Sequence, residues 1–169
     1  MAKSPIPLSA ARLKELLDYN PETGAFTWRV TLGARAQAGT TLYGANSHGY
    51  KVLRLDRQLY RAHRLAWLHF YGVWPSKGID HINGVRGDNR IANLREANQS
   101  ENMANDRRRS NNKSGFKGVS WAKSEGKWQA HIMVRYKSMC LGKFDTPEAA
   151  HEAYRAAALR HFGEFARLE

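Results

Sequence analysis

The feature that most constrains the fold is a stretch of eight residues, 107–114, that contains no hydrophobic side chain. It carries four positive charges, on Arg107, Arg108, Arg109 and Lys113, and otherwise only Ser and Asn. A stretch of this composition cannot join a packed core and is typical of a linker. The chain of 169 residues is therefore predicted to form separate packed regions on either side of it.

The chain is strongly basic, and its charge is unevenly distributed. The formal net charge is +12, made up of +6 in residues 1–76, −1 in 77–106 and +7 in 107–169. Such a bias favours polyanionic partners and says nothing about fold. Two basic flanks around a nearly neutral centre fit flanks that hold phosphates and a centre that does chemistry. A merely solvated basic surface is the alternative that charge alone leaves open.

The cysteine content and the hydropathy of the chain indicate in which cellular compartment it works. Cys140 is the single cysteine, so the chain forms no intrachain disulfide and offers no Cys-x-x-Cys zinc site. The first residues lack the apolar segment of a signal peptide, and no apolar run is long enough to cross a membrane. We expect a cytoplasmic protein without membrane association.

Residues 1–76 are predicted to form an α/β region that precedes and supports the central segment. The pattern predicts a helix over 10–18, capped by Ser9, and a helix over 62–71 with Phe70 on its core face. Residues 31–49 are predicted to be irregular. The remaining pattern predicts strands at 26–28, 50–55 and 58–61.

Residues 77–106 are short and rich in polar side chains. Strands are expected at 79–82 and 93–96, with a loop that opens at Asn83-Gly84 between them. A helix follows, with Asn98 as its N-cap and Glu101 completing a capping box. The predicted order is strand, loop, strand, helix.

Four residues of this segment suit phosphodiester hydrolysis. His81 is a natural general base, because an imidazole titrates near neutral pH. Asn93, on the neighbouring strand, could hold the imidazole by a hydrogen bond. Asp80 and Asn102 offer hard oxygen atoms, which suit Mg²⁺ or Mn²⁺.

The spacing of these residues resembles the HNH nucleases of phage and intron origin. Asn93 lies twelve positions after His81, and Asn102 lies nine positions after Asn93. Residues 60–67 also look like this family. The resemblance implies a ββα-metal fold, one divalent cation, and work in a bacterial or phage-infected host cell. Asn102 stands where many members have His, a variant that weakens any expectation of zinc or nickel.

Residues 115–169 resemble the AP2 DNA-binding domain. The resemblance is carried by Gly118-Val119, by Leu141 to Thr146, and by the alanines and Tyr154 of the last helix. It implies a three-stranded antiparallel sheet plus helix, in which the sheet enters the major groove of DNA. The expected fold class is thus α+β, a ββα-metal nuclease domain followed by an AP2-like module.

The middle strand of this sheet is expected at residues 127–135. Alternation along it separates side chains that face the helix from side chains that face outward. Trp128, Ala130, Ile132 and Val134 should face the helix. The remaining candidates for DNA contact, besides the linker, are Lys117, Trp121, Lys127, Gln129, His131 and Arg135. Trp121 fits the core equally well. Ser120, Met133 and Cys140 fall where plant AP2 domains carry arginines, so sequence preference does not transfer.

Three hypotheses follow for the whole chain. The first is a homing-type, metal-dependent endonuclease that nicks double-stranded DNA as a monomer or weak dimer, without an obligatory protein partner. The second is a DNA-binding regulatory protein with an inactive nuclease domain, which the intact set of Asp80, His81, Asn93 and Asn102 argues against. The third is an RNA-binding or structural protein, which explains the charge but leaves the spacing to coincidence.

Overall fold

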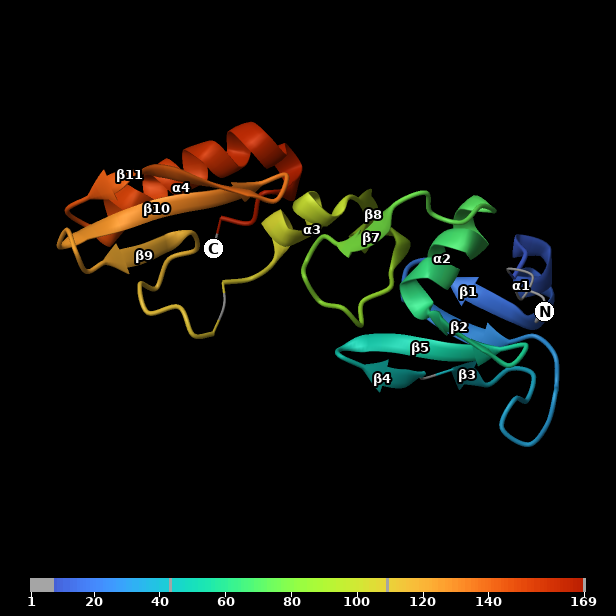
Figure 1. Cartoon of the computed structure of the whole chain (residues 1–169). Helices are drawn as coiled ribbons and strands as arrows, with labels where there is room; N and C mark the ends of the chain where they lie inside the picture. The colour runs from blue at the N-terminus through green and yellow to red at the C-terminus, as the bar shows by residue number, and fades with distance from the viewer. Residues whose placement is uncertain (1–7, 43, 109, 169) are drawn as a thin grey trace, which may run out of the picture. The chain divides into compact units, whose positions relative to one another are not determined.

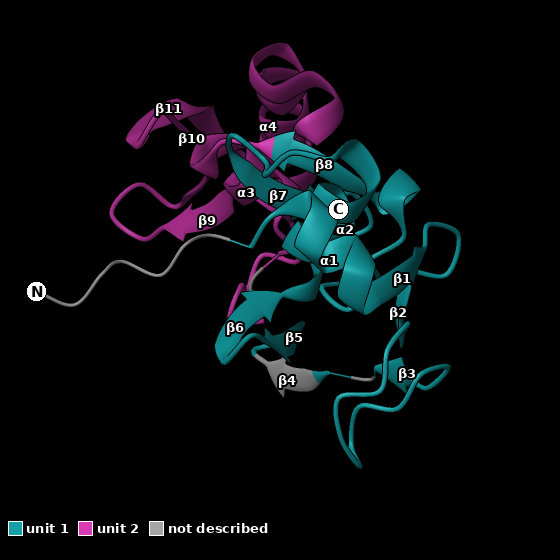
Figure 2. Cartoon of the chain, turned by 90° about the vertical axis from the view of Figure 1, so that its right-hand side faces the viewer, with its two compact units in different colours: residues 1–96 teal, residues 97–169 magenta. Residues whose placement is uncertain are grey.

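The computed structural model describes residues 8–42, 44–108 and 110–168. The chain divides into two compact units, Met1–Glu96 and Ala97–Glu169, which Figure 2 shows in two colours. Both mix helices with small antiparallel sheets. Within the described ranges no helix combines the length and the hydropathy that a membrane span requires.

Unit 1 begins with helix α1 (Ala10–Leu16), whose first turn is capped by Ser9 through a 3.1 Å bond from the Arg12 amide. The helix ends earlier than the sequence predicted, because Leu17 already belongs to strand β1 (Leu17–Asn20). A turn leads into β2 (Ala25–Trp28), which pairs with β1. The segment predicted to be irregular also holds two short strands, β3 (Thr41–Leu42) and β4 (Ala45–Ser47).

A second sheet and helix complete the core of unit 1 (Figure 1). The predicted hairpin is confirmed as β5 (Tyr50–Leu55) and β6 (Gln58–Arg61). The predicted helix is confirmed as α2 (Ala62–Tyr71), which ends at Gly72 in the left-handed conformation. The expected burial of Phe70 is wrong, because its ring is 50% exposed and lies edge-on to Tyr71. Leu65 and Leu68 instead carry the core face of α2.

The polar segment follows the predicted order of elements. Strand β7 (Gly78–His81) pairs with β8 (Leu94–Ala97), and a loop and a short 3-10 helix, η1 (Ile91–Asn93), lie between them. Helix α3 (Gln99–Asn105) then starts with the predicted capping box of Asn98 and Glu101. Contacts place α3 in unit 2, whereas β7 and η1 belong to unit 1.

Unit 2 is built on one three-stranded antiparallel sheet and one long helix. The sheet has the order β11-β10-β9, from β9 (Val119–Ala122), β10 (Lys127–Val134) and β11 (Lys137–Phe144). Helix α4 (Pro147–Phe162) begins at the Thr146 cap, and η2 (Gly163–Phe165) follows it. Ala130 and Ile132 face α4, as the alternation predicted, and pack against its small residues and Tyr154. A side chain at Gly118 would overlap the Tyr154 ring, so the helix sits close to the sheet.

Candidate functional site

His81 stands at the end of β7, where the chain leaves the sheet for the loop toward η1. Its side chain is buried, with 4% of the residue exposed. Burial lowers the pKa of His81, and a hydrogen bond to Asn89 opposes part of that shift. At neutral pH the ring is therefore uncharged, which is the form that can accept a proton.

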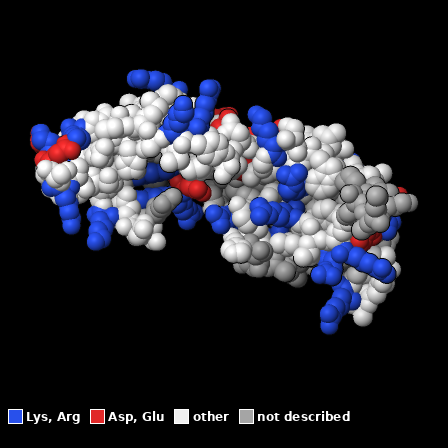
Figure 3. All heavy atoms as spheres, viewed as in Figure 1, with Lys and Arg blue, Asp and Glu red and all other residues white. Residues whose placement is uncertain are grey.

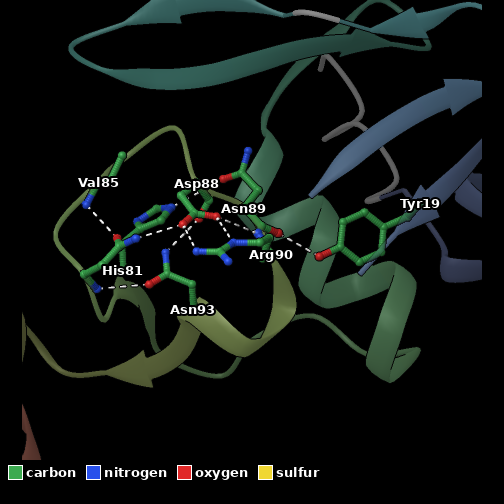
Figure 4. A network of polar contacts seen from close by, with 8 residues as sticks. Tyr19, His81, Val85, Asp88, Asn89, Arg90 and Asn93 are labelled. Carbon is green, nitrogen blue, oxygen red and sulfur yellow. Dashed lines mark hydrogen bonds and ion pairs between the residues drawn. The ribbon is translucent and has the colours of Figure 1, made fainter. Parts of the chain in front are cut away.

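Asn89 fixes the tautomer of this imidazole. Nε2 of His81 lies 3.3 Å from Oδ1 of Asn89 (Figure 4). An amide oxygen can only accept, so Nε2 carries the proton and Nδ1 holds the basic lone pair. Asn89 is itself 2% exposed, and its Nδ2 has no hydrogen-bond partner in the described structure.

The N-terminal hairpin holds Asn89 in place. The hydroxyl of Tyr19 donates to the carbonyl oxygen of Asn89 at 2.7 Å. The amide of Ile91 donates to the carbonyl oxygen of Pro21 at 3.0 Å. Gly24 has φ +71°, and a Cβ there would lie 2.6 Å from the backbone of Asn89 and Arg90. The turn between β1 and β2 thus packs directly on the loop that positions His81.

Asn93 does not hold the imidazole in this structure, contrary to the sequence-based expectation. Its Oδ1 accepts from the amide of Asn83 at 3.0 Å, and its Nδ2 donates to the carbonyl of Asp88 at 2.9 Å. Both ends of the side chain therefore tie the two sides of the loop together. The reason is its position in η1, which aims the amide into the loop.

Asp88 is the second anchor of the loop. Its carboxylate pairs with Arg90 at 2.6 Å and accepts from Nδ2 of Asn83 at 2.8 Å. The hydrogen bonds from Arg90 lower the pKa of Asp88 to about 2. The loop that follows His81 is thus closed by ionised and amide groups rather than by an apolar core.

Asp80 is the one carboxylate of β7, and it is buried beside a cation. Its Oδ2 accepts from Nε of Arg95 on β8 at 2.9 Å, and both side chains are largely shielded from solvent. A carboxylate has acceptor capacity on both oxygens, so this pair does not exhaust it. Among the described residues no three His, Cys, Asp or Glu side chains cluster as metal ligands. A carboxylate oxygen such as those of Asp80 suits Mg²⁺ or Mn²⁺, which keep waters and take phosphate oxygens as further ligands.

Two further rings surround His81. The ring of His63 lies edge-on to it, with centroids 5.0 Å apart, and the ring of Tyr50 lies 5.9 Å away. His63 is 3% exposed, and its Nδ1 has no hydrogen-bond partner in the described structure. Burial lowers the pKa of His63 to about 3, so this ring is also neutral.

The remaining predicted metal ligand, Asn102, lies on α3 in unit 2. Its backbone amide continues the helix by bonding to the carbonyl of Asn98. The described structure places Asn102 within a capped, regular helix.

Two of the predicted DNA contacts have other positions. The ammonium of Lys117 donates to the carbonyl oxygens of Ala104 at 2.5 Å and Asp106 at 2.6 Å, so it closes the end of α3. Trp121 pairs in register with Trp128, and Val119 with Ala130. Residues opposite each other in a sheet share a face, so Trp121 lies on the helix side and not on the outward side.

Lys127, Gln129 and His131 lie on β10, on the side that alternation predicted to face outward, whereas Arg135, expected on the same strand, lies in the turn that follows it. Lys127 and His131 are exposed, and Gln129 is half-buried. Nε2 of Gln129 donates to Sγ of Cys140 at 3.2 Å. Lys127 pairs with Asp145 at 3.2 Å across exposed surface. Arg135 is exposed in the turn between β10 and β11, and its amide donates to Oγ of Ser100.

The basic stretch contributes exposed charge. Arg107, Arg108 and Lys113 are exposed, and Arg108 donates to the carbonyl of Asn112 at 3.3 Å. Arg109 lies outside the described residues. Asn112 and Ser114 bond to the backbone of Phe116 and Val119, so the end of the stretch is anchored to unit 2.

Sequence reasoning missed Asn89, Tyr19 and Gly24 as parts of this site. Asn89 lies eight residues from His81, inside a loop where several Asn side chains compete for the same role. Its burial depends on a hairpin more than sixty residues away, which local patterns do not reveal. The residues around Gly24 predicted a turn and gave no indication of a contact with Asn89.

Two family models match the chain in succession. The HNH endonuclease model matches residues 60–104, and the AP2 domain model matches residues 114–164. The first match therefore covers β7, the loop, β8 and most of α3. The second covers the three-stranded sheet and α4.

Similar proteins divide in the same way. Protein 3.8 of Escherichia phage T7 is 34% identical over 117 residues, which is 66% of this chain and 95% of that protein. APETALA2-like protein 2 of Oryza sativa is 40% identical over 50 residues, which is 30% of this chain but only 12% of that protein. No solved structure matches the chain.

Proposed function

We propose that this chain, which belongs to the HNH endonucleases and carries an AP2 domain behind the nuclease segment, is a metal-dependent enzyme that hydrolyses phosphodiester bonds of duplex DNA. The observation that carries the proposal is the buried His81, whose tautomer is set by Asn89 within the segment that matches the HNH model.

His81 acts as the general base. With Nε2 protonated against Asn89, Nδ1 takes a proton from water as the water oxygen attacks phosphorus. The bond from phosphorus to the 3′-oxygen breaks as the new bond forms. His63 and Tyr50 exclude bulk water from two sides of the ring, and the loop tied by Asn93 and Asp88 keeps its position.

Asp80 and Asn102 are proposed to hold the divalent cation. This pairing rests on their spacing in the sequence and on the oxygen chemistry of both side chains. A bound Mg²⁺ or Mn²⁺ would supply Lewis-acid stabilisation of the charge that develops on the phosphate and the departing oxygen. Arg95 holds the Asp80 carboxylate by its Oδ2 and so fixes the direction of the proposed ligand.

Unit 2 is proposed as the DNA anchor. Its outward sheet face presents Lys127, Gln129 and His131, and the turn after β10 adds Arg135. The basic stretch contributes the charges of Arg107, Arg108, Arg109 and Lys113. Phosphate contacts of this kind position a protein on DNA, whereas sequence is read from base edges. One nuclease segment per chain favours a nick by a monomer, and a weak dimer would be needed to cut both strands.

The direct test is the conversion of supercoiled plasmid to nicked circle. Wild-type protein should nick in Mg²⁺ or Mn²⁺ and stop in excess chelator. His81→Ala should lose roughly 10²-fold to 10⁴-fold in rate, as general-base removal does. His161→Ala, an exposed histidine of α4, is the matched control and should cut normally. DNA binding without any metal-dependent cleavage would identify the chain instead as a regulator with an inactive nuclease segment.

The metal assignment has its own test. Asp80→Asn and Asn102→Ala should each raise the Mg²⁺ concentration needed for half-maximal cleavage. Two ligands of one ion act as a unit, so the double variant should be less impaired than independent effects would give. A variant that keeps the wild-type metal response would remove that residue from the ligand set.

A further inference from the structure

Two arginines converge on one aromatic ring beside His81. The guanidinium carbon of Arg61 lies 4.8 Å from the centre of the Tyr50 ring, and that of Arg86 lies 5.1 Å from the same centre. The Tyr50 ring in turn lies 5.9 Å from the His81 ring and 5.2 Å from the His63 ring. We call Arg61, Tyr50 and Arg86 the arginine–tyrosine cluster.

The elements of unit 1 bring the cluster together from distant parts of the chain. Tyr50 opens β5, Arg61 ends β6, and Arg86 belongs to the loop after β7. Nη1 of Arg86 donates to the carbonyl oxygen of His48 at 3.1 Å, and its methylenes lie against Gly49. Arg86 therefore joins the loop of His81 to the β4–β5 turn.

The positive charges of the cluster are not neutralised by the protein. Within residues 8–42, 44–108 and 110–168, neither Arg61 nor Arg86 forms an ion pair, although other arginines of unit 1 do. Both side chains are exposed. Figure 3 shows Lys and Arg atoms gathered over the part of unit 1 that holds β7 and the loop after it.

Two like charges beside one ring are unfavourable unless an anion joins them. An aromatic face attracts each guanidinium, so the Tyr50 ring holds both positive charges close to one another. A planar guanidinium matches the oxygens of a phosphate in a two-point contact.

We propose that the arginine–tyrosine cluster binds backbone phosphates of duplex DNA next to the phosphodiester that His81 attacks. This inference rests on the proposed function, because it takes the polyanion to be the DNA substrate. The cluster gives unit 1 specific binding residues, whereas the individual DNA contacts predicted from the sequence all lie between residues 107 and 135. It would hold the scissile strand against His81 after unit 2 has bound.

The test is the salt dependence of DNA binding by the full-length protein. Affinity for a short duplex is measured by fluorescence anisotropy in chelator, from about 50 to 200 mM salt. Each lost phosphate contact should reduce the slope of log affinity against log salt by about 0.9. Arg61→Gln and Arg86→Gln should each show this loss, and the double variant about twice as much.

Matched variants separate binding from packing. Arg35→Gln removes one exposed arginine from the loop between β2 and β3 of the same unit and should leave the slope unchanged. Arg86→Lys keeps the charge and should keep most of the slope. A purely structural role for Arg86 would lower the melting temperature of Arg86→Gln and leave the slope at its wild-type value. Arg61→Gln, at an exposed strand end, provides the answer if the double variant does not fold.

The salt slope tests the phosphate site, and plasmid cleavage tests the nuclease activity, so the two can fail separately. A folded double variant with the wild-type slope overturns the cluster as a phosphate site, even if the wild-type protein cuts plasmid. A reduced slope in a protein that never cuts supports the cluster and overturns the nuclease instead. Reduced slope together with metal-dependent nicking supports both.

Discussion

The polar side chains around His81 and those on the outer face of the β10 sheet have opposite surroundings. His81, Asn89 and Asp80 are each less than 7% exposed and make defined hydrogen bonds or ion pairs. Lys127 and His131 lie in solvent, and the Lys127 ion pair crosses exposed surface. Buried polar groups are costly to leave without partners, whereas exposed pairs contribute little. Single substitutions should therefore have large effects in the first region and small, salt-dependent effects in the second.

The largest effect is expected at the buried ion pair. Arg95→Met removes the cationic partner of the buried Asp80 carboxylate and should destabilise unit 1 by about 3–5 kcal/mol. Mg²⁺ should recover more of the stability of this variant than it adds to the wild type, because Asp80 is the proposed ligand and has lost the positive charge of Arg95. Denaturant unfolding with and without Mg²⁺ measures both. Arg29→Met, which removes an exposed partner of Asp18, is the control and should cost under about 1 kcal/mol.

Asn89→Ala should come next. It removes the acceptor of His81 Nε2–H and should cost about 1–3 kcal/mol at the imidazole, equivalent to roughly 5-fold to 150-fold in the cleavage rate. A positioning role predicts that kcat falls while KM stays constant, and that Asn89→Asp, which also accepts, recovers part of the rate. If KM rose and kcat did not change, Asn89 would serve substrate binding instead.

His63 should make unit 1 sensitive to acid. Its folded pKa is lowered to about 3, so the unfolded chain binds a proton below pH 6.5 that the folded chain excludes. The contribution of the neutral His63 to the free energy of unfolding is therefore fully present above pH 6.5. It is lost as the pH falls toward 3, by about 1.4 kcal/mol per pH unit. His63→Phe should reduce this dependence, which unfolding midpoints at several pH values between these limits would reveal. Equal dependence in both proteins would mean that His63 titrates normally.

The smallest effect is expected on the sheet of unit 2. Lys127→Ala should weaken DNA binding slightly and reduce the salt slope by about one, because one phosphate contact is lost. Glu148→Gln, on α4, changes the net charge by one unit of opposite sign on the other side of the sheet, and should leave the slope unchanged. A gel shift across a salt series gives both values. Equal slopes for Lys127→Ala and the wild type would remove Lys127 from the contact surface.

Local patterns predicted most of the elements but not all of the contacts. The hairpin of β5 and β6, helix α2 and the capping box of α3 all depend on neighbours in the sequence, and each was confirmed. The short strands β3 and β4 were missed, because two or three residues carry no detectable alternation. Phe70 was misplaced because its position at the end of α2 lies beyond the packed core.

The side chains of the site were harder to assign because their partners are distant. The ammonium of Lys117 donates to carbonyl oxygens at the C-terminal end of α3. The alternation of residues in a strand cannot predict such a contact. The sequence could have decided which face of the sheet Trp121 occupies. It lies two residues after Val119, a core residue of the same strand, and side chains two positions apart in a strand share a face. Asn93 and Asn89 both lie in the loop region, and only the folded chain shows which amide reaches His81.

The central claim is that unit 1 cuts DNA through His81 while unit 2 anchors it. The most direct measurement is the affinity and the cleavage rate of full-length His81→Ala and of Lys127→Ala/Arg135→Ala on one duplex. His81→Ala should bind DNA like the wild type and lose at least about 100-fold in cleavage rate. The double variant should bind more weakly and cut at the wild-type rate once the DNA is saturating. Near wild-type turnover by His81→Ala would contradict the account.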